Sequence, residues 1–159
     1  EHFPFSKESV DNWSQGTPKS TNWPIVYTIN NDSEIYVGCD SQEVGHKINY
    51  VTTICMYEFG KGAHVIHCKE TIDKPAKLNP IANMHPKLWS EVVRSVSVAE
   101  SLKDINAKIT VHVDYNSKQS EKSNQLYEAG IGYAKSMGYD AVGKPDAWAA
   151  SSAADNYCR

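Results

Sequence analysis

The amino-acid sequence predicts an α/β domain with a five-stranded mixed sheet and helices on both faces. Two observations lead to this fold class. The first half of the chain holds three apolar, β-branched runs with short connections, which is typical of an antiparallel meander. The second half alternates helix-period and strand-like runs, which is typical of parallel strands joined by helices. The predicted order is β-β-β-α-β-α-β-α.

The meander begins with a short apolar run over residues 35–39, followed by Asp40 and Ser41, and we expect a strand that ends at Asp40. Residues 48–59 are rich in β-branched side chains and lead into a Gly-Lys-Gly turn. Residues 63–72 complete the meander. Because the connections are short, these three strands should pair in chain order.

Helical and strand-like patterns alternate after the meander. Residues 74–86 contain three prolines and predict a loop, with Pro86 at the first position of the next helix, where its missing N–H costs nothing. Gly138 follows a second helical pattern, as glycine often does at a helix end. In chain order the predicted elements are a helix over 87–103, a strand over 107–113, a helix over 120–137, a strand over 139–142 and an alanine-rich helix over 146–157.

Length and composition indicate one domain. The chain has 159 residues, 40% of them hydrophobic and 22% charged, which suits a single core. We expect residues 1–33 to be an N-terminal extension packed on a domain over 34–159, with 25–29 a candidate additional strand. The chain carries no secretory signal pattern and no apolar run of the roughly 20 residues that span a membrane, so we expect a cytoplasmic protein without a membrane partner.

Cysteine usage and charge restrict the function classes. The four cysteines show no C-x-x-C spacing, and three lie in apolar runs, so reduced, buried thiols are expected. The net charge of −3 argues against a protein that holds nucleic acid by bulk electrostatics alone. Two bound divalent cations would reverse the sign of that charge, so the composition does not exclude a nucleic-acid partner.

Acidic side chains follow two of the predicted strands. Asp40 and Asp114 each end a strand, and ligands of α/β sheets bind beyond the carboxyl ends of parallel strands. If the two strands are adjacent, their carboxylates repel unless a cation neutralises both. Oxygen ligands of this kind suit a hard divalent metal. The competing interpretation is that each aspartate is an ordinary turn residue.

Two helices add further acids. Glu91 shares a helical row with Leu88, Val98 and Leu102, so we expect it on or beside the buried face, although a solvated acid favoured by the helix dipole is the alternative. Glu100 is expected at the surface. Asp146 and Asp155 are about 2.5 turns apart and point to opposite faces. We prefer Asp146, at the helix start, and expect Asp155 to be a surface or structural residue.

Four segments resemble the ribonuclease H-like superfamily. Tyr-Val-Gly-Cys-Asp-Ser around Asp40 resembles its first catalytic strand, and the segment 90–102 resembles its first helix, with Glu91 as the catalytic acid. Val-His-Val-Asp-Tyr-Asn around Asp114 resembles its fourth strand. Lys-Pro-Asp-Ala-Trp-Ala-Ala around Asp146 resembles the closing helix of the Holliday-junction-resolvase branch. Over residues 34–159 the chain is most similar to bacterial and phage predicted ribonuclease H-related nucleases.

This resemblance implies a nuclease that hydrolyses phosphodiester bonds with two Mg²⁺ or Mn²⁺ ions about 3.5–4 Å apart. Asp40 would bridge both ions, Glu91 and Asp114 would hold one, and Asp146 the other. Residues expected to contact substrate or shuttle a proton are Lys144, Asn116, Ser41 and His85, with solvated loop residues as the alternative for Lys144 and His85. The type of nucleic acid, endonuclease or exonuclease action and the oligomeric state stay open.

Two other hypotheses compete with the nuclease. One is a zinc site formed by His64, His67 and Cys68, although on a strand 67 faces away from 64 and 68, and no second cluster completes the ligand set. The other is a non-catalytic module that keeps the fold and binds nucleic acid or protein, with the region of Trp13 and Trp23 as a contact.

Overall fold

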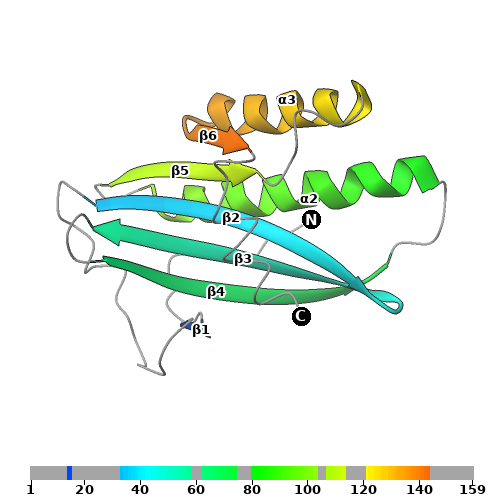
Figure 1. Cartoon of the computed structure of the whole chain (residues 1–159), viewed down its shortest axis with the longest axis horizontal. Helices are drawn as coiled ribbons and strands as arrows, with labels where there is room; N and C mark the ends of the chain where they lie inside the picture. The colour runs from blue at the N-terminus through cyan, green and yellow to red at the C-terminus, as the bar shows by residue number, and fades with distance from the viewer. Residues whose placement is uncertain are drawn as a thin grey trace.

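The computed structural model describes residues 14–15, 33–58, 62–74, 80–103, 107–113 and 121–143. Their strands form one six-stranded mixed sheet in the order β1-β4-β3-β2-β5-β6 (Figure 1). The strands are β1 (Ser14–Gln15), β2 (Ser33–Val44), β3 (Lys47–Glu58), β4 (Gly62–Asp73), β5 (Lys108–Val113) and β6 (Asp140–Gly143), and the helices are α2 (Pro80–Ser101) and α3 (Glu121–Ser136).

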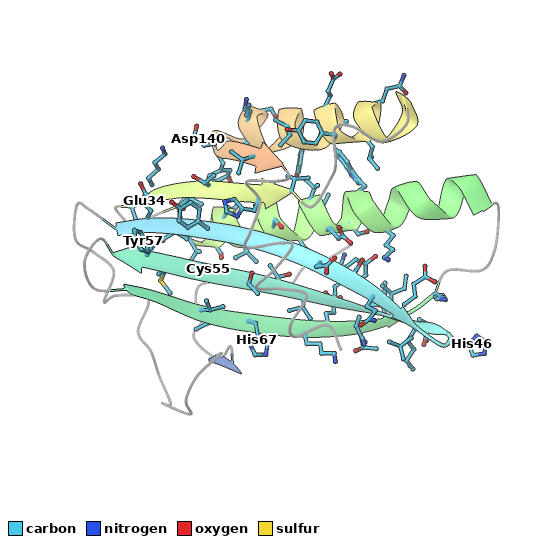
Figure 2. The ribbon with its side chains drawn as sticks, viewed as in Figure 1. Glu34, His46, Cys55, Tyr57, His67 and Asp140 are labelled. Carbon is cyan, nitrogen blue, oxygen red and sulfur yellow. The ribbon has the colours of Figure 1, made fainter. Side chains whose placement is uncertain are left out.

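The predicted topology is confirmed for these elements. β2, β3 and β4 pair antiparallel in chain order, β5 lies parallel to β2, and β6 lies parallel to β5. The two-residue strand β1, which the sequence pattern did not predict, pairs antiparallel with β4 at His67 and Ile66 (Figure 2). The candidate strand over 25–29 and the predicted final helix over 146–157 lie outside the described residues.

The prediction that Asp40 ends its strand is wrong. β2 continues to Val44 and returns through a two-residue turn into β3, with Gly45 at a φ of 60°. A side chain is disfavoured at that φ, so glycine suits the tight turn, which pairs the polar residues 41–44 with β3. Among the described residues, the parallel pairing with β5 extends to Gly38, two residues before Asp40.

Helix α2 begins six residues earlier than predicted. Pro80, rather than Pro86, takes the first helical position, and Pro86 lies inside the helix. Glu91 therefore lies near the middle of this 22-residue helix and not in its first turns. The helix dipole acts mainly on the first and last turns, so it does not explain an acid at this position.

One face of the sheet packs on α2. Ile35 and Val37 of β2 are fully buried there, together with Val92 and Val96 of the helix and Leu102 just after it. Burying each such side chain stabilises the fold by roughly 1.5–3 kcal/mol. Helices α2 and α3 contact each other and lie over the β2–β5–β6 part of the sheet (Figure 1). The opposite face holds buried residues as well, including Val51, Thr53 and Cys55.

The end of α3 agrees with its prediction. Gly138 has a φ of 95°, and the N–H of Tyr139 donates to the carbonyl of Ala134 at 3.1 Å, which closes the helix in a glycine-based cap. Cys39 and Cys55 are buried free thiols and Cys68 is a half-buried one, as expected, whereas Cys158 lies outside the described residues. Within the described part of the chain, neither helix is long and apolar enough to cross a membrane.

Candidate metal centre

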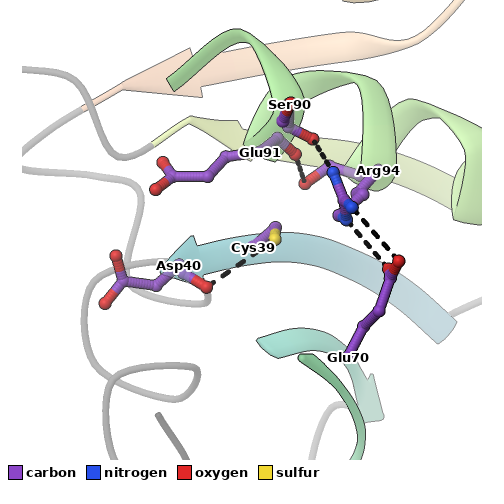
Figure 3. Close-up of polar contacts among 7 residues, drawn as sticks. Cys39, Asp40, Glu70, Ser90, Glu91 and Arg94 are labelled. Carbon is purple, nitrogen blue, oxygen red and sulfur yellow. Dashed lines mark hydrogen bonds and ion pairs between the residues drawn. The ribbon is translucent and has the colours of Figure 1, made fainter. Parts of the chain in front are cut away.

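Asp40 lies on β2 just beyond the point where β5 stops pairing with it. Its side chain is half-buried, and its Oδ1 accepts a hydrogen bond from the backbone N–H of Ser41 at 2.9 Å. The thiol of Cys39 contacts the Asp40 carbonyl oxygen at 3.8 Å (Figure 3). These local contacts hold the aspartate against the backbone of β2 at the end of its parallel pairing.

Glu91 lies on the buried face of α2, as predicted, with only 4% of its surface exposed. The hydroxyl of Ser41 donates to Glu91 Oε1, which joins the helix to β2. The hydroxyl of Ser95 donates to the Glu91 carbonyl at 3.0 Å. A buried carboxylate needs hydrogen bonds or a cation to offset its lost hydration, and Ser41 supplies one such bond.

The two acids border the same edge of β2. Side chains alternate along a strand, so Asp40 leaves β2 on the face opposite Ser41, whereas Glu91 approaches from the face that Ser41 occupies. Figure 3 shows both carboxylates extending toward one side of the view, away from Glu70. Both acids lie where β2 continues beyond its last described pair with β5, which joins Gly38 and His112.

A partly buried ion pair lies one turn further along α2 from Glu91. Arg94 Nε and Nη2 donate to the two carboxylate oxygens of Glu70 on β4, at 3.0 and 3.3 Å. Its Nη1 donates to the carbonyl of Ser90 at 3.4 Å, and its guanidinium lies 3.9 Å from the centre of the Tyr50 ring. Burial raises the pKa of Tyr50, so this ring stays neutral under the cation.

The sequence interpretation missed this ion pair. The signal for it was an arginine placed within the apolar stretch that follows Glu91, on a helix whose neighbouring positions are buried. A buried arginine needs a partner, but the partner comes from a distant strand and has no local signature.

Four of the predicted site residues lie outside the described residues: Asn116, Asp114, Lys144 and Asp146. His85 lies within α2, but the structure does not describe its side chain. Val113, the last described residue of β5, directly precedes Asp114. Among the residues that the structure describes, no three His, Cys, Asp or Glu side chains gather to hold a metal; this part of the chain contains two of the four predicted ligands.

The other sequence-derived candidates are placed as follows. On β4, His67 and Cys68 point to opposite faces, which agrees with the objection to a zinc site. Glu100, expected at the surface, is half-buried and accepts a hydrogen bond from the Tyr139 hydroxyl at 2.6 Å, toward the far end of α2. Trp13, Trp23 and Asp155 lie outside the described residues.

The donor chemistry of Asp40 and Glu91 fits a hard divalent cation. Both offer carboxylate oxygens, which Mg²⁺ and Mn²⁺ prefer, and the neighbouring Ser41 adds a hydroxyl rather than a thiolate or imidazole. Glu91 is almost fully buried, so a bound cation would offset a charge that water hardly reaches.

Comparison with known proteins identifies the family. The family model described as Ribonuclease H-like matches residues 25–159. The chain belongs to the ribonuclease H-like family. The resemblance read from the four segments is thereby confirmed at this level, and ribonuclease H-like enzymes generally use divalent metals. Membership of the narrower bacterial and phage group stays a prediction.

Two solved structures are similar to this ribonuclease H-like chain. RNase H1 from the halophilic archaeon Halobacterium salinarum NRC-1 is 12% identical, with a TM-score of 0.39, covering 73% of this chain and 89% of that one. The N-terminal RNase H domain of Rv2228c from Mycobacterium tuberculosis is 13% identical, with a TM-score of 0.39, covering 79% of this chain and 93% of that one. No curated protein matches the chain significantly.

Proposed function

We propose that this chain is a divalent-metal-dependent nuclease that hydrolyses phosphodiester bonds of nucleic acid. The proposed ligands of two Mg²⁺ or Mn²⁺ ions are Asp40, Glu91, Asp114 and Asp146. The observation that carries the proposal is the placement of a buried Glu91 and of Asp40 along one edge of β2, where its parallel pairing with β5 ends.

The described ends of two strands support the choice of the remaining acids. β2 and β5 pair from Glu34 with Lys108 to Gly38 with His112, so β5 runs toward the Asp40 end of this pairing, and its last described residue, Val113, directly precedes Asp114 in the chain. β5 pairs with β6 up to Val113 with Gly143, so the described end of β6, three residues before Asp146 in the chain, lies at the same end of the sheet. Ligand sites of α/β sheets form at such carboxyl ends.

The chain's own residues would hold and orient the reacting groups. When bound, the ions supply an activated water and stabilise the leaving oxygen. Asp40 and Glu91 would hold the ions, and their negative charge would favour divalent cations. Lys144 and Asn116 are proposed to contact the phosphate, and His85 to move a proton. Ser41 donates to Glu91, and its contact with substrate stays a prediction.

Cleavage by an Asp40→Asn variant tests the proposal. The purified chain is incubated with Mg²⁺ or Mn²⁺ and a panel of hybrid, single-stranded, duplex and junction substrates. Asp40→Asn should abolish cleavage, because it removes a charged ligand and keeps the side-chain shape. Asp140→Asn is the matched control, since Asp140 is an exposed aspartate at the opposite end of the β5–β6 pair, paired with Lys108 at 3.4 Å.

Three outcomes of this experiment are informative. Cleavage that depends on metal and on Asp40, but not on Asp140, supports the nuclease, and the preferred substrate of the panel names its target. Undiminished cleavage by Asp40→Asn rules out this site. Binding of Mn²⁺ without cleavage of any substrate would contradict the nuclease and favour the non-catalytic binding module.

A further inference from the structure

The arginine on the next turn of α2 is directed away from Glu91. Residues three apart on a helix are neighbours, with Cβ atoms about 5–6 Å apart, so a glutamate and an arginine at this spacing ordinarily pair. Arg94 instead directs two nitrogens to Glu70 and a third to the Ser90 carbonyl. Figure 3 shows Arg94 turned toward Glu70, with the Glu91 carboxylate extending the opposite way.

The residues that receive these contacts form one row across the sheet. Ser41 pairs with Tyr50, and Tyr50 pairs with Glu70, so the three lie side by side on β2, β3 and β4. Ser41 contacts Glu91 at one end of the row, and Glu70 contacts Arg94 at the other. Tyr50 lies between them and supports the guanidinium with its ring.

We propose that Ser41 and Glu70 are positioning residues that prepare Glu91 for a divalent cation: Ser41 fixes its carboxylate, and Glu70 holds the Arg94 guanidinium away from it. This inference rests on the proposed function. A guanidinium bound to Glu91 would have to be displaced before a metal ion could bind there. Because Arg94 is paired with Glu70, its guanidinium does not compete with an ion for the Glu91 carboxylate.

Manganese titration of a Glu70→Gln variant tests the role of Glu70. Calorimetry of the metal-stripped protein measures the affinity for Mn²⁺ without any need for turnover. Glu70→Gln should weaken Mn²⁺ binding about tenfold or more, because the released guanidinium would compete with the ion for Glu91; losses of this size are usual for residues that support a metal site from outside its ligands. Asp73→Asn is the matched control: it removes one carboxylate from the same strand, in an exposed pair with Lys47, and should change the affinity less than about twofold.

A second substitution separates positioning from mere damage to the fold. Adding Arg94→Met to Glu70→Gln removes the cation that Glu70 restrained and should restore the Mn²⁺ affinity to within a few fold of wild type. Arg94→Met alone also breaks the ion pair but frees no cation, so it should bind Mn²⁺ within a few fold of wild type, whereas damage from the lost ion pair would weaken binding in that variant too. On the other side of the site, Ser41→Ala should weaken Mn²⁺ binding, and Ser41→Thr, which keeps the hydroxyl, should retain it.

The failure of this inference is distinguishable from the failure of the proposed function. If wild type binds Mn²⁺ and Glu70→Gln binds it as tightly as Asp73→Asn does, the positioning role of Glu70 is overturned and the metal site stands. If the double variant binds no better than Glu70→Gln, the restraint of Arg94 is likewise overturned. A wild-type chain that binds no Mn²⁺ overturns the proposed function and this inference together.

Discussion

The Arg94–Glu70 ion pair predicts unequal losses of stability when its two partners are neutralised separately. The Arg94 side chain is 3% exposed, whereas the Glu70 side chain is 35% exposed. Glu70→Gln leaves a buried guanidinium without its counter-charge. Arg94→Met leaves a carboxylate that water partly solvates, and the methionine keeps most of the apolar stem. The free energy of unfolding should therefore decrease more for Glu70→Gln, which removes the more exposed partner, than for Arg94→Met.

The exposed fractions of the Arg94 and Glu70 side chains determine how much stability each substitution should cost. Removing one partner of a fully buried pair costs roughly 3–5 kcal/mol, because the remaining charge is left uncompensated. The Ser90 carbonyl and the Tyr50 ring still contact Arg94 in Glu70→Gln, so we expect a loss of about 2–3 kcal/mol, allowing about 1 kcal/mol for such contacts. For Arg94→Met, with Glu70 partly hydrated, we expect a loss below about 1 kcal/mol.

Urea unfolding at neutral pH in the presence of a chelator measures both losses without a metal contribution. The midpoint should fall further for Glu70→Gln than for Arg94→Met, with similar slopes for the two variants. Asp73→Asn, whose pair with Lys47 is exposed on both sides, should unfold close to wild type. A loss for Arg94→Met as large as that for Glu70→Gln would refute the reasoning from exposure.

Three further predictions concern packing and titration. A Cβ added at Gly143 would lie 2.1 Å from the Tyr127 ring, whereas one at Gly132 meets nothing within 4 Å. Gly143→Ala should therefore destabilise the fold by about 1–3 kcal/mol. Gly132→Ala, in the interior of α3, should stabilise it by about 0.5–1 kcal/mol. Thermal melts in which the Gly143→Ala variant is more stable than the Gly132→Ala variant would contradict this packing. Burial raises the pKa of the Cys55 thiol to about 12, so the native protein should protect it from alkylation at mildly alkaline pH, and peptide mapping of the labelled protein should find Cys55 modified only after unfolding. Burial also lowers the pKa of His67 below its ordinary 6.5, so the unfolded chain binds the proton more readily than the folded one. The free energy of unfolding should therefore decrease as the pH drops from 6.5 toward the pKa of the folded state. His67→Gln should reduce this decrease, and a pH profile of stability that the substitution leaves unchanged would contradict the reasoning.

The sequence predicted the topology because each strand and helix carries its own periodicity. It failed at boundaries where two local signals compete. The polar segment 41–44 resembles a loop, but the tight turn at Gly45 pairs it with β3 and lengthens β2. Pro80 and Pro86 can each begin a helix, and the observed helix begins at the earlier one.

The burial of Glu91 could be predicted because helical spacing was informative. Glu91 shares a row with apolar side chains, and that spacing places it on the buried face. The partners of Arg94 could not be found in the same way, because Glu70 and Tyr50 come from two different strands and meet the helix only after the sheet has packed. Contacts between distant segments depend on strand register, which a local pattern does not determine.

Anomalous diffraction from crystals soaked in Mn²⁺ tests the central claim most directly. The account predicts an anomalous peak about 2.0–2.3 Å from carboxylate oxygens of both Asp40 and Glu91, at the edge of β2 beyond Gly38, with Asp114 and Asp146 completing the ligands. Crystals that contain Mn²⁺ elsewhere but none between these two residues, or carboxylates too far apart to share an ion, would contradict it.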